Sequence, residues 1–176
     1  LLLCVERHAT SKIGNAEDLL RIQSLGFRGE ALPSMAAVSR MQITSFAGGE
    51  MSGYRLRISG GKLLEIEEVG APVGTTVEVK DLFFNTPARK KFLRTVRTET
   101  DQVIDRVIRA ALPHPEIHFL LEEAGKPLVR LPSSKRFLPR LSALLGRKVA
   151  ESLLEGEKAH SGFFLRLFAA PPEYSR

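Results

Sequence analysis

The stretch Gly74–Arg89 reads GTTVEVKDLFFNTPAR and carries three local signals in a row. Val77 and Val79 alternate with polar and charged residues, which is typical of a half-buried strand. Pro87 suits the first turn of a helix, where its missing N–H has no partner to lose. We therefore expect a strand, then a turn, and then a helix over residues 87–94.

The residues before this stretch also alternate between apolar and polar positions, and Gly60-Gly61 marks a turn between two such segments. We expect an antiparallel portion of a sheet with strands near residues 41–45, 54–59, 64–66 and 77–79. Small and apolar residues also predict two helices, at residues 18–25 and 30–38. Pro33 fits the second of these only in its first turn.

The residues after this stretch contain the clearest amphipathic helix in the chain, at 99–112. Beyond it we expect a hairpin at residues 117–131 and further helices around Gly146, at residues 141–154. A final strand is expected at residues 163–167. The cluster of turn formers at 131–135 is the best linker candidate and predicts a domain boundary near Pro132. The expected domains are therefore residues 1–132 and 133–176.

The composition is that of a globular chain, with 176 residues, 43% hydrophobic and 26% charged. It excludes collagen-like, low-complexity and wholly disordered proteins. The formal charge of +6 permits a polyanionic partner such as nucleic acid. Cys4 is the single cysteine, so the chain forms no internal disulfide, and a reducing, cytoplasmic compartment is the simpler expectation. We expect no metal site from the His and Cys spacing and no membrane-spanning segment.

Three clusters carry residues suited to binding phosphate. The segment RHATSK at residues 7–12 places hydroxyls beside an ammonium, although a simple helix end would look the same. The segment GFRGEAL at 26–32 joins a glycine-flanked loop to a helix start, which is also how ordinary interhelical loops look. Thr75 could hydrogen-bond a ligand or could simply favour the strand.

Five positive charges without an acidic residue between them form a basic run near the middle of the chain. Such a run attracts DNA phosphates, but a solvated helix face has the same composition. The run consists of Arg89, Lys90, Lys91, Arg94 and Arg97.

Taken together, RHATSKI, SLGFRGEAL and GTTVEVKDLFFNTPARKKFLR resemble the signatures of the MutL family of DNA mismatch-repair proteins, in its bacterial form. That family shares an ATPase superfamily with gyrase, heat-shock chaperones and histidine kinases. The resemblance implies a Bergerat-type ATP-binding fold of α/β (α+β) class, a two-layer sandwich with a mixed sheet. It also implies that residues 133–176 begin a second, transducer-like α/β domain of ribosomal-protein type.

The resemblance implies binding roles residue by residue. Thr10, Ser11 and Lys12 match the segment that borders the nucleotide and its lid. Gly26, Phe27, Arg28 and Gly29 match the lid loop around the triphosphate. Ala31 and Leu32 match the helix start beneath the phosphates, and Thr75 matches a threonine that helps to hold adenine. Arg89 closes the last motif, where its expected role is structural.

The resemblance also implies what this chain does not carry. The family's general-base glutamate, its magnesium-binding asparagine and its adenine-reading DxGxG motif match nothing here and would precede Arg7. We therefore expect a fragment without catalytic residues, a partial ATPase domain lacking its N-terminal part, which alone does not hydrolyse ATP and binds ATP and Mg weakly at most. In the intact protein the resemblance implies ATP-driven homodimerisation and action on DNA with the mismatch-recognition protein MutS and a downstream nuclease or helicase.

Two other functions stay open. The chain could belong to another ATPase of the same superfamily, such as a topoisomerase or a chaperone. It could also be a non-enzymatic nucleic-acid-binding module that uses the GxxG loop and the basic run. Such a module would bind nucleic acid independently of nucleotide.

Overall fold

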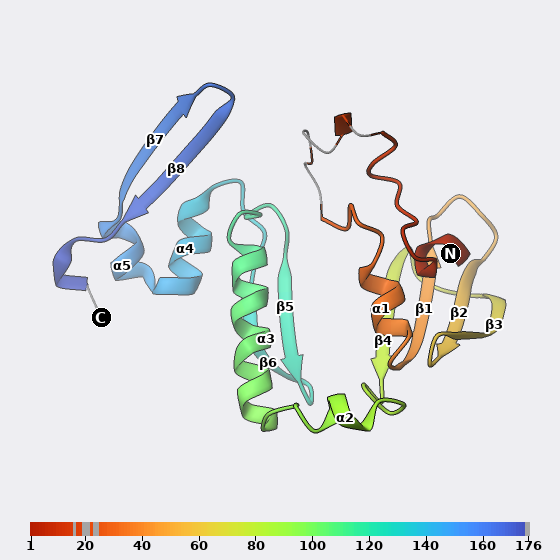
Figure 1. Cartoon of the computed structure of the whole chain (residues 1–176). Helices are drawn as coiled ribbons and strands as arrows, with labels where there is room; N and C mark the ends of the chain where they lie inside the picture. Colours follow the sequence, from red (N-terminus) through yellow and green to blue (C-terminus); the bar gives the residue numbers. More distant parts are fainter. Residues whose placement is uncertain (16, 19–21, 23–24, 175–176) are drawn as a thin grey trace. The chain divides into compact units, whose positions relative to one another are not determined.

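The computed structural model describes residues 1–15, 17–18, 22 and 25–174, and the chain forms two compact units, Leu1–Leu93 and Arg94–Arg176 (Figure 1). Each unit has its own cluster of buried hydrophobic side chains. The helix expected over residues 18–25 falls largely outside the described residues.

The first unit is built on a four-stranded sheet with the order β3-β2-β1-β4. Its strands are β1 (Arg40–Phe46), β2 (Gly53–Ser59), β3 (Lys62–Val69) and β4 (Gly74–Lys80). All four expected strands are confirmed, each slightly longer than the alternating residues indicate. The mixed sheet implied by the resemblance is corrected: in the described part of the chain every strand pairing is antiparallel, because short connections return β2 beside β1 and β3 beside β2.

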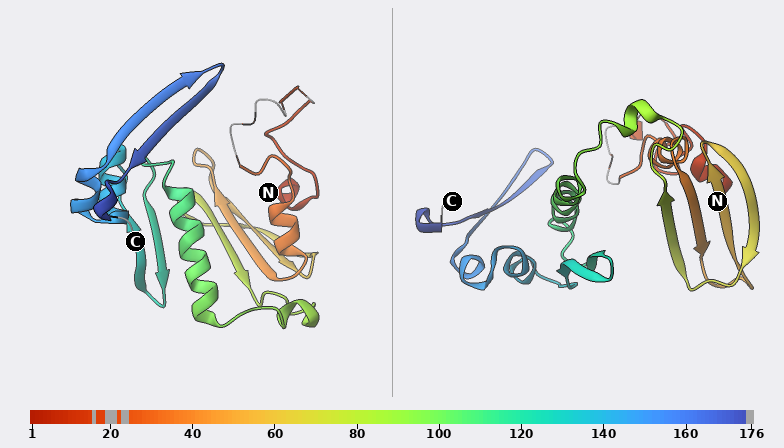
Figure 2. Two further views of the ribbon diagram at one scale, coloured as in Figure 1. Left: turned by 60° about the vertical axis from the view of Figure 1, so that its left-hand side comes forward. Right: turned by 90° about the horizontal axis from the view of Figure 1, so that it is seen from below.

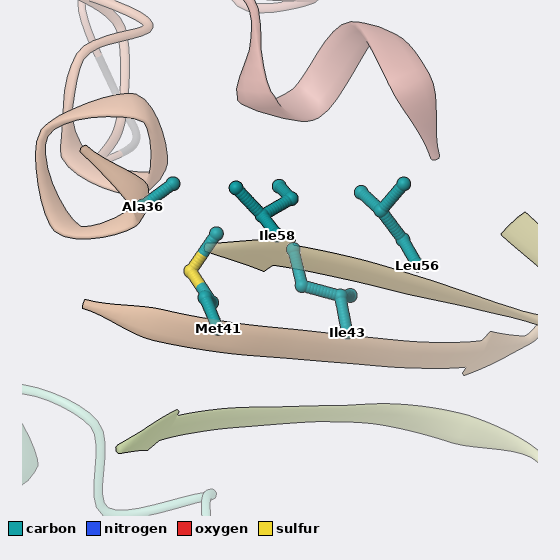
Figure 3. Close-up of a cluster of buried hydrophobic side chains, with 5 residues drawn as sticks. All are labelled: Ala36, Met41, Ile43, Leu56 and Ile58. Atoms are coloured by element: carbon teal, nitrogen blue, oxygen red, sulfur yellow. The ribbon is translucent and has the colours of Figure 1, made fainter. Parts of the chain in front are cut away.

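One face of this sheet is apolar and carries the core. The helix α1 (Ala31–Ala36) and the 3-10 turn η1 (Leu2–Val5) both lie on this face. Figure 3 shows the side chains of the sheet pointing toward them. The cluster of buried residues comprises Ala36, Met41, Ile43, Leu56 and Ile58.

The opposite face of the sheet is charged. Arg57 lies 2.9 Å from the carboxylate of Glu65 and 3.4 Å from that of Glu67, and Arg55 also pairs with Glu67 at 3.0 Å. Ion pairs at the surface contribute at most about 1 kcal/mol each, although the Arg55–Glu67 pair is half-buried. Burial of the apolar face, rather than the ion pairs of the charged face, therefore provides most of the stabilisation of this sheet.

The connection after β4 contains only a short helix. α2 (Pro87–Lys90) is one turn long, so the expectation of a helix over 87–94 is wrong at its C-terminal end. Thr95 then starts a new helix, since its hydroxyl accepts a hydrogen bond from the N–H of Thr98 at 3.3 Å. A helix cannot run through a residue with the extended backbone of this cap.

The second unit begins with α3 (Val96–Ala111), which confirms the expected amphipathic helix. It packs on the hairpin of β5 (Phe119–Glu123) and β6 (Lys126–Leu131). The turn residues Ala124 and Gly125 both have positive φ, of 48° and 76°, as the favoured two-residue hairpin turn requires. The buried residues here are Ala111, Val129 and Leu131.

The rest of this unit contains α4 (Phe137–Leu145), α5 (Arg147–Ser152), β7 (Leu154–His160), β8 (Phe163–Ala169) and the short η3 (Pro172–Tyr174). The β7–β8 hairpin extends away from α4 and α5 as a twisted ribbon (Figure 2). The helices expected over residues 141–154 are wrong at their C-terminal end, because Leu154 already belongs to β7. Residues 155–160 show no clear alternation of their own and become a strand by pairing with β8.

The domain boundary expected near Pro132 stays a prediction. The two units divide at Leu93 by packing, which is a different criterion from a family's domain boundary. Leu144 of α4 packs on the Ala111 cluster, so residues on both sides of Pro132 share that core. Among the residues that the structure describes, no helix combines the length and the apolar character needed to cross a bilayer.

Candidate functional site

Two of the three phosphate-suited clusters lie side by side in the first unit. The N–H of His8 donates to the carbonyl of Gly29 at 3.2 Å, and the hydroxyl of Thr10 donates to the carbonyl of Gly26 at 3.2 Å. The same hydroxyl oxygen accepts from the N–H of Lys12 at 3.2 Å. These contacts join the segment at residues 7–12 to the glycine loop at residues 26–29.

Gly29 permits the closest of these contacts. Its φ is +61°, and a Cβ at this position would lie 2.5 Å from the carbonyl oxygen of Ala9 and 2.8 Å from the carbonyl carbon of His8. Every other residue type would therefore overlap with backbone. The structure therefore shows that Gly29 permits a close approach of backbone to backbone.

The joined segments line a cavity of about 580 Å³, a volume in the usual range for small-molecule sites. Its polar lining contains one cation, Lys12, and one carboxylate, Glu30, among the described residues. The carboxylate of Glu30 lies 3.5 Å from Nδ1 of His8. The full lining is Leu1, Leu3, Cys4, Ala9, Thr10, Ser11, Lys12, Gly26, Gly29, Glu30, Ala31, Leu32 and Pro33.

The polar groups of this lining divide into two kinds. Thr10 is occupied by contacts within the chain, since its hydroxyl both donates and accepts. The hydroxyl of Ser11 and the ammonium of Lys12 take part in none of the hydrogen bonds found in the described part of the chain. The ammonium lies close to Gly26, 3.2 Å from the position that a Cβ would take. A ligand would therefore meet Ser11 and Lys12 as donors.

The apolar part of the lining includes the one cysteine. Partial burial of Cys4 raises the pKa of its thiol above the usual value, with desolvation as the main cause. The thiol is therefore neutral at physiological pH and adds no charge to the cavity. Lys12 remains the charge available to an anion, because Glu30 has His8 as a partner.

Three of the residues assigned by resemblance lie outside this lining. The guanidinium of Arg28 lies 5.5 Å from the ring centre of Phe27, and neither residue belongs to the cavity wall. Thr75 lies on β4, where its hydroxyl is 2.7 Å from the hydroxyl of Ser45 on β1. The structure thus brings together the segments around Thr10 and Gly26 but leaves Thr75 paired within the sheet.

The basic run is exposed throughout. In the described part of the chain none of its five side chains forms an ion pair, in contrast to the paired arginines of the sheet. Arg89 and Lys90 lie in α2, and Lys91 follows directly. Phe92, which the sequence analysis did not single out, is 84% exposed beside them. An exposed aromatic ring next to three cations is a common feature of surfaces that bind single-stranded nucleic acid.

Curated relatives decide the family. Over 175 residues the chain is 49% identical to the DNA mismatch repair protein MutL of Heliobacterium modesticaldum and 44% identical to that of Geobacter sulfurreducens. Each match covers 99% of this chain, and it covers 26% and 29% of the respective relative. This chain belongs to the bacterial MutL family. No protein-family model matches the chain.

Solved structures agree with the MutL assignment. The chain resembles the Aquifex aeolicus MutL ATPase domain complexed with ADP, with a TM-score of 0.70 and 32% identity. The match covers 89% of this chain and 60% of that structure. A second structure of the ATPase domain from the same MutL gives a TM-score of 0.65 at 30% identity over 89% and 57% of the two chains. The fold is therefore the α+β fold of the MutL ATPase domain, as the three motifs indicated.

The chain spans about a quarter of the length of these MutL relatives. Its residues around the cavity fit a phosphate-bearing ligand, because Ser11 and Lys12 offer donors and a positive charge. They do not fit a magnesium ion, which is usually held by one or two free carboxylates together with waters and substrate phosphates. In the described lining only Glu30 has a carboxylate, and His8 already contacts it.

Proposed function

We propose that this chain forms a phosphate-facing wall of the ATP site in a MutL-type protein of DNA mismatch repair. The observation that carries the proposal is the convergence of Lys12, Ser11 and the Gly26–Gly29 loop on one cavity. The related ATPase domain with ADP in its crystal supports a nucleotide as the ligand. When bound, ATP supplies a polyphosphate whose charge Lys12 would neutralise.

The chain's own residues have separable tasks in this site. The hydroxyl of Thr10 holds the glycine loop through the carbonyl of Gly26, while Ser11 and Lys12 contact the ligand. Apolar residues such as Leu32 and Pro33 form the remaining wall. A base for hydrolysis and the ligands for magnesium come, in this proposal, from residues outside the described lining.

The experiment is a titration of the intact protein with a fluorescent ATP analogue. Lys12→Met should weaken binding roughly tenfold, because a charge-assisted hydrogen bond is lost. Lys62→Met is the matched control, since this exposed lysine begins β3 and does not line the cavity. Absence of analogue binding by the unaltered protein, or equal affinity for the Lys12 variant, would overturn the proposal.

A second function has its own observation in its favour. The exposed basic run and Phe92 support DNA contact by this segment. Replacing Lys90, Lys91 and Arg94 by alanine should lower the slope of log affinity against log salt by about 2 to 3. Replacing Lys62, Lys126 and Lys158 by alanine removes the same charge elsewhere on the chain, and this control should lower the slope by less. Equal slopes for the two triple variants would refute a local contact.

The remaining proposals concern the intact protein. We infer ATP-driven homodimerisation, cooperation with MutS and a downstream nuclease or helicase, and a cytoplasmic location, all from membership of the MutL family. The start of a second, transducer-like domain after Pro132 belongs to the same proposal. Sedimentation of the intact protein with and without ATP tests the ATP-driven homodimerisation. Dimerisation that does not depend on ATP would favour a nucleic-acid-binding module without an ATP switch.

A further inference from the structure

The C-terminal end of α1 is held by two distant loops. The last carbonyl groups of a helix lack partners within the helix and need other donors. Here the five consecutive carbonyl groups at residues 35–39 each accept a hydrogen bond from such a donor. Ser39 Oγ donates to Met35 (2.7 Å), the N–H of Gly61 to Ala36 (2.9 Å), Asn85 Nδ2 to Ala37 (2.9 Å), the N–H of Phe83 to Val38 (2.7 Å) and the N–H of Gly60 to Ser39 (3.0 Å).

The loop that supplies two of these donors has an unfavourable backbone. Asp81 and Phe83 have positive φ angles of 51° and 64°, although neither is glycine. A bulky residue with such an angle is strained, and the surrounding contacts must maintain the strain. Arg40 provides some of them, with its guanidinium 3.3 Å from the carboxylate of Asp81 and 5.3 Å from the ring centre of Phe84. The strained turn directs Phe83 and Asn85 at α1.

The other end of α1 reaches the proposed phosphate-facing cavity, whose wall contains Glu30, Ala31, Leu32 and Pro33. The helix has six residues and so is about 9 Å long. A segment this short moves as one body, and a displacement at its C-terminal end therefore reaches the cavity wall.

We propose that Asn85, within the NTPAR motif, is a positioning residue for the cavity. Its amide fixes the far end of α1 through the carbonyl of Ala37 and so sets where the near end meets the ligand. Asn85 itself is not part of the cavity wall. This inference rests on the proposed nucleotide site and adds to it a coupling between the loop after β4 and the phosphate-facing wall.

The test compares Asn85→Asp with Asn85→Ala in the intact protein. A carboxylate has nearly the shape of the amide but cannot donate to Ala37, whereas the protonated acid can. The ordinary pKa of an Asp carboxyl is about 3.9, and a carbonyl oxygen as neighbour raises it. The affinity of the Asp variant for the analogue should thus be roughly tenfold low near neutral pH and should rise as the pH falls below about 5 toward the pKa of the carboxyl group. The Ala variant should be weak at both pH values.

Gln42→Glu is the matched control. It makes the same amide-to-acid change on the charged face of β1, where Gln42 accepts from Arg57 and a carboxylate still can. Its affinity relative to the unaltered protein should not change with pH. Hydrogen exchange of residues 31–39 in the nucleotide-free proteins gives a second measurement that does not depend on binding, and it should be faster in both Asn85 variants.

The outcomes separate the two proposals. If the unaltered protein does not bind the analogue, the nucleotide site is wrong and the positioning role fails with it. If it binds and Asn85→Asp matches it across the pH range, only the positioning role is overturned. Faster exchange in both Asn85 variants without a pH-reversible loss of affinity makes Asn85 merely structural and also overturns the proposal. A loss that reverses in Asn85→Asp alone supports it.

Discussion

Replacement of Gly29 by alanine tests the contact that holds the two site segments together. At φ +61° an alanine costs about 1 to 2 kcal/mol relative to a right-handed conformation. The added Cβ would also lie 2.5 Å from the carbonyl oxygen of Ala9, so the two segments must separate. Overpacking of this kind costs roughly another 1 to 3 kcal/mol. Alanine also has less conformational freedom than glycine in the unfolded chain, which offsets the loss of stability by about 0.4 to 1 kcal/mol.

The net local loss is therefore roughly 1 to 5 kcal/mol, which favours opening of this part of the structure. Gly49→Ala is the control, because Gly49 also has a positive φ, of +80°, but nothing lies within 4 Å of its Cβ position. This control should show that introducing an alanine at a positive-φ glycine without any overlap leaves residues 7–12 and 26–30 unaffected. The assay is hydrogen exchange in the intact protein, followed in peptides that cover residues 7–12 and 26–30.

Exchange in these peptides should be at least about tenfold faster in Gly29→Ala than in Gly49→Ala, since a tenfold change corresponds to about 1.4 kcal/mol. Binding of the ATP analogue should fall in parallel. Equal exchange in the two variants would refute the reasoning, because it would mean that the backbone at residues 8–9 tolerates a side chain at position 29.

Further predictions concern three other residues. Arg140 is 1% exposed, and its Nη2 lies within 3.3 Å of four backbone carbonyl oxygens, among which its two N–H groups are shared. Arg140→Met should therefore destabilise the second unit by about 3 kcal/mol, with the exposed Arg136→Met as a nearly neutral control in thermal melting. No change in melting would mean that desolvation of the guanidinium cancels its hydrogen bonds. Arg57→Ala should cost less than about 1 kcal/mol and nothing at high salt, because its pairs with Glu65 and Glu67 are exposed; a larger loss in urea unfolding would contradict this. The raised pKa of Cys4 means that the folded state disfavours its thiolate. Below the ordinary pKa of a thiol, Cys4 therefore does not destabilise the fold. As the pH rises from that ordinary pKa through the raised pKa of Cys4, the folded state loses stability. Alkylation near pH 8 should therefore be slower than that of a cysteine peptide, and an equal rate would contradict the burial of Cys4.

Local patterns predicted most of the first unit. Alternation placed all four strands of its sheet, and the small apolar residues before them placed α1 around Pro33. These elements follow from the sequence because each buries one face, and burial of one face requires a fixed period. The helix after Pro87 was overextended, since nothing in its composition shows that the Thr95 hydroxyl caps a second helix.

β7 shows where local patterns fail. Its residues include three charges and a glycine, and their sequence alone does not indicate a strand. The strand exists because β8 presents unpaired backbone groups beside it and because Glu157 pairs with Arg166 across the hairpin. Contacts between segments supply the preference that the segment itself lacks.

The candidate site divides in the same way. Residue types alone marked Thr10, Lys12 and the glycine loop as suited to phosphate, since hydroxyl, ammonium and glycine each have a specific chemistry. Their grouping around one cavity, and the separation of Thr75 from it, required the folded chain. Asn85 was visible only as part of a motif, and its contact with Ala37 bridges 48 residues of sequence. Periodicity and residue chemistry are local properties that can be read along a chain, whereas a hydrogen bond between distant segments exists only once packing has brought its donor and acceptor together.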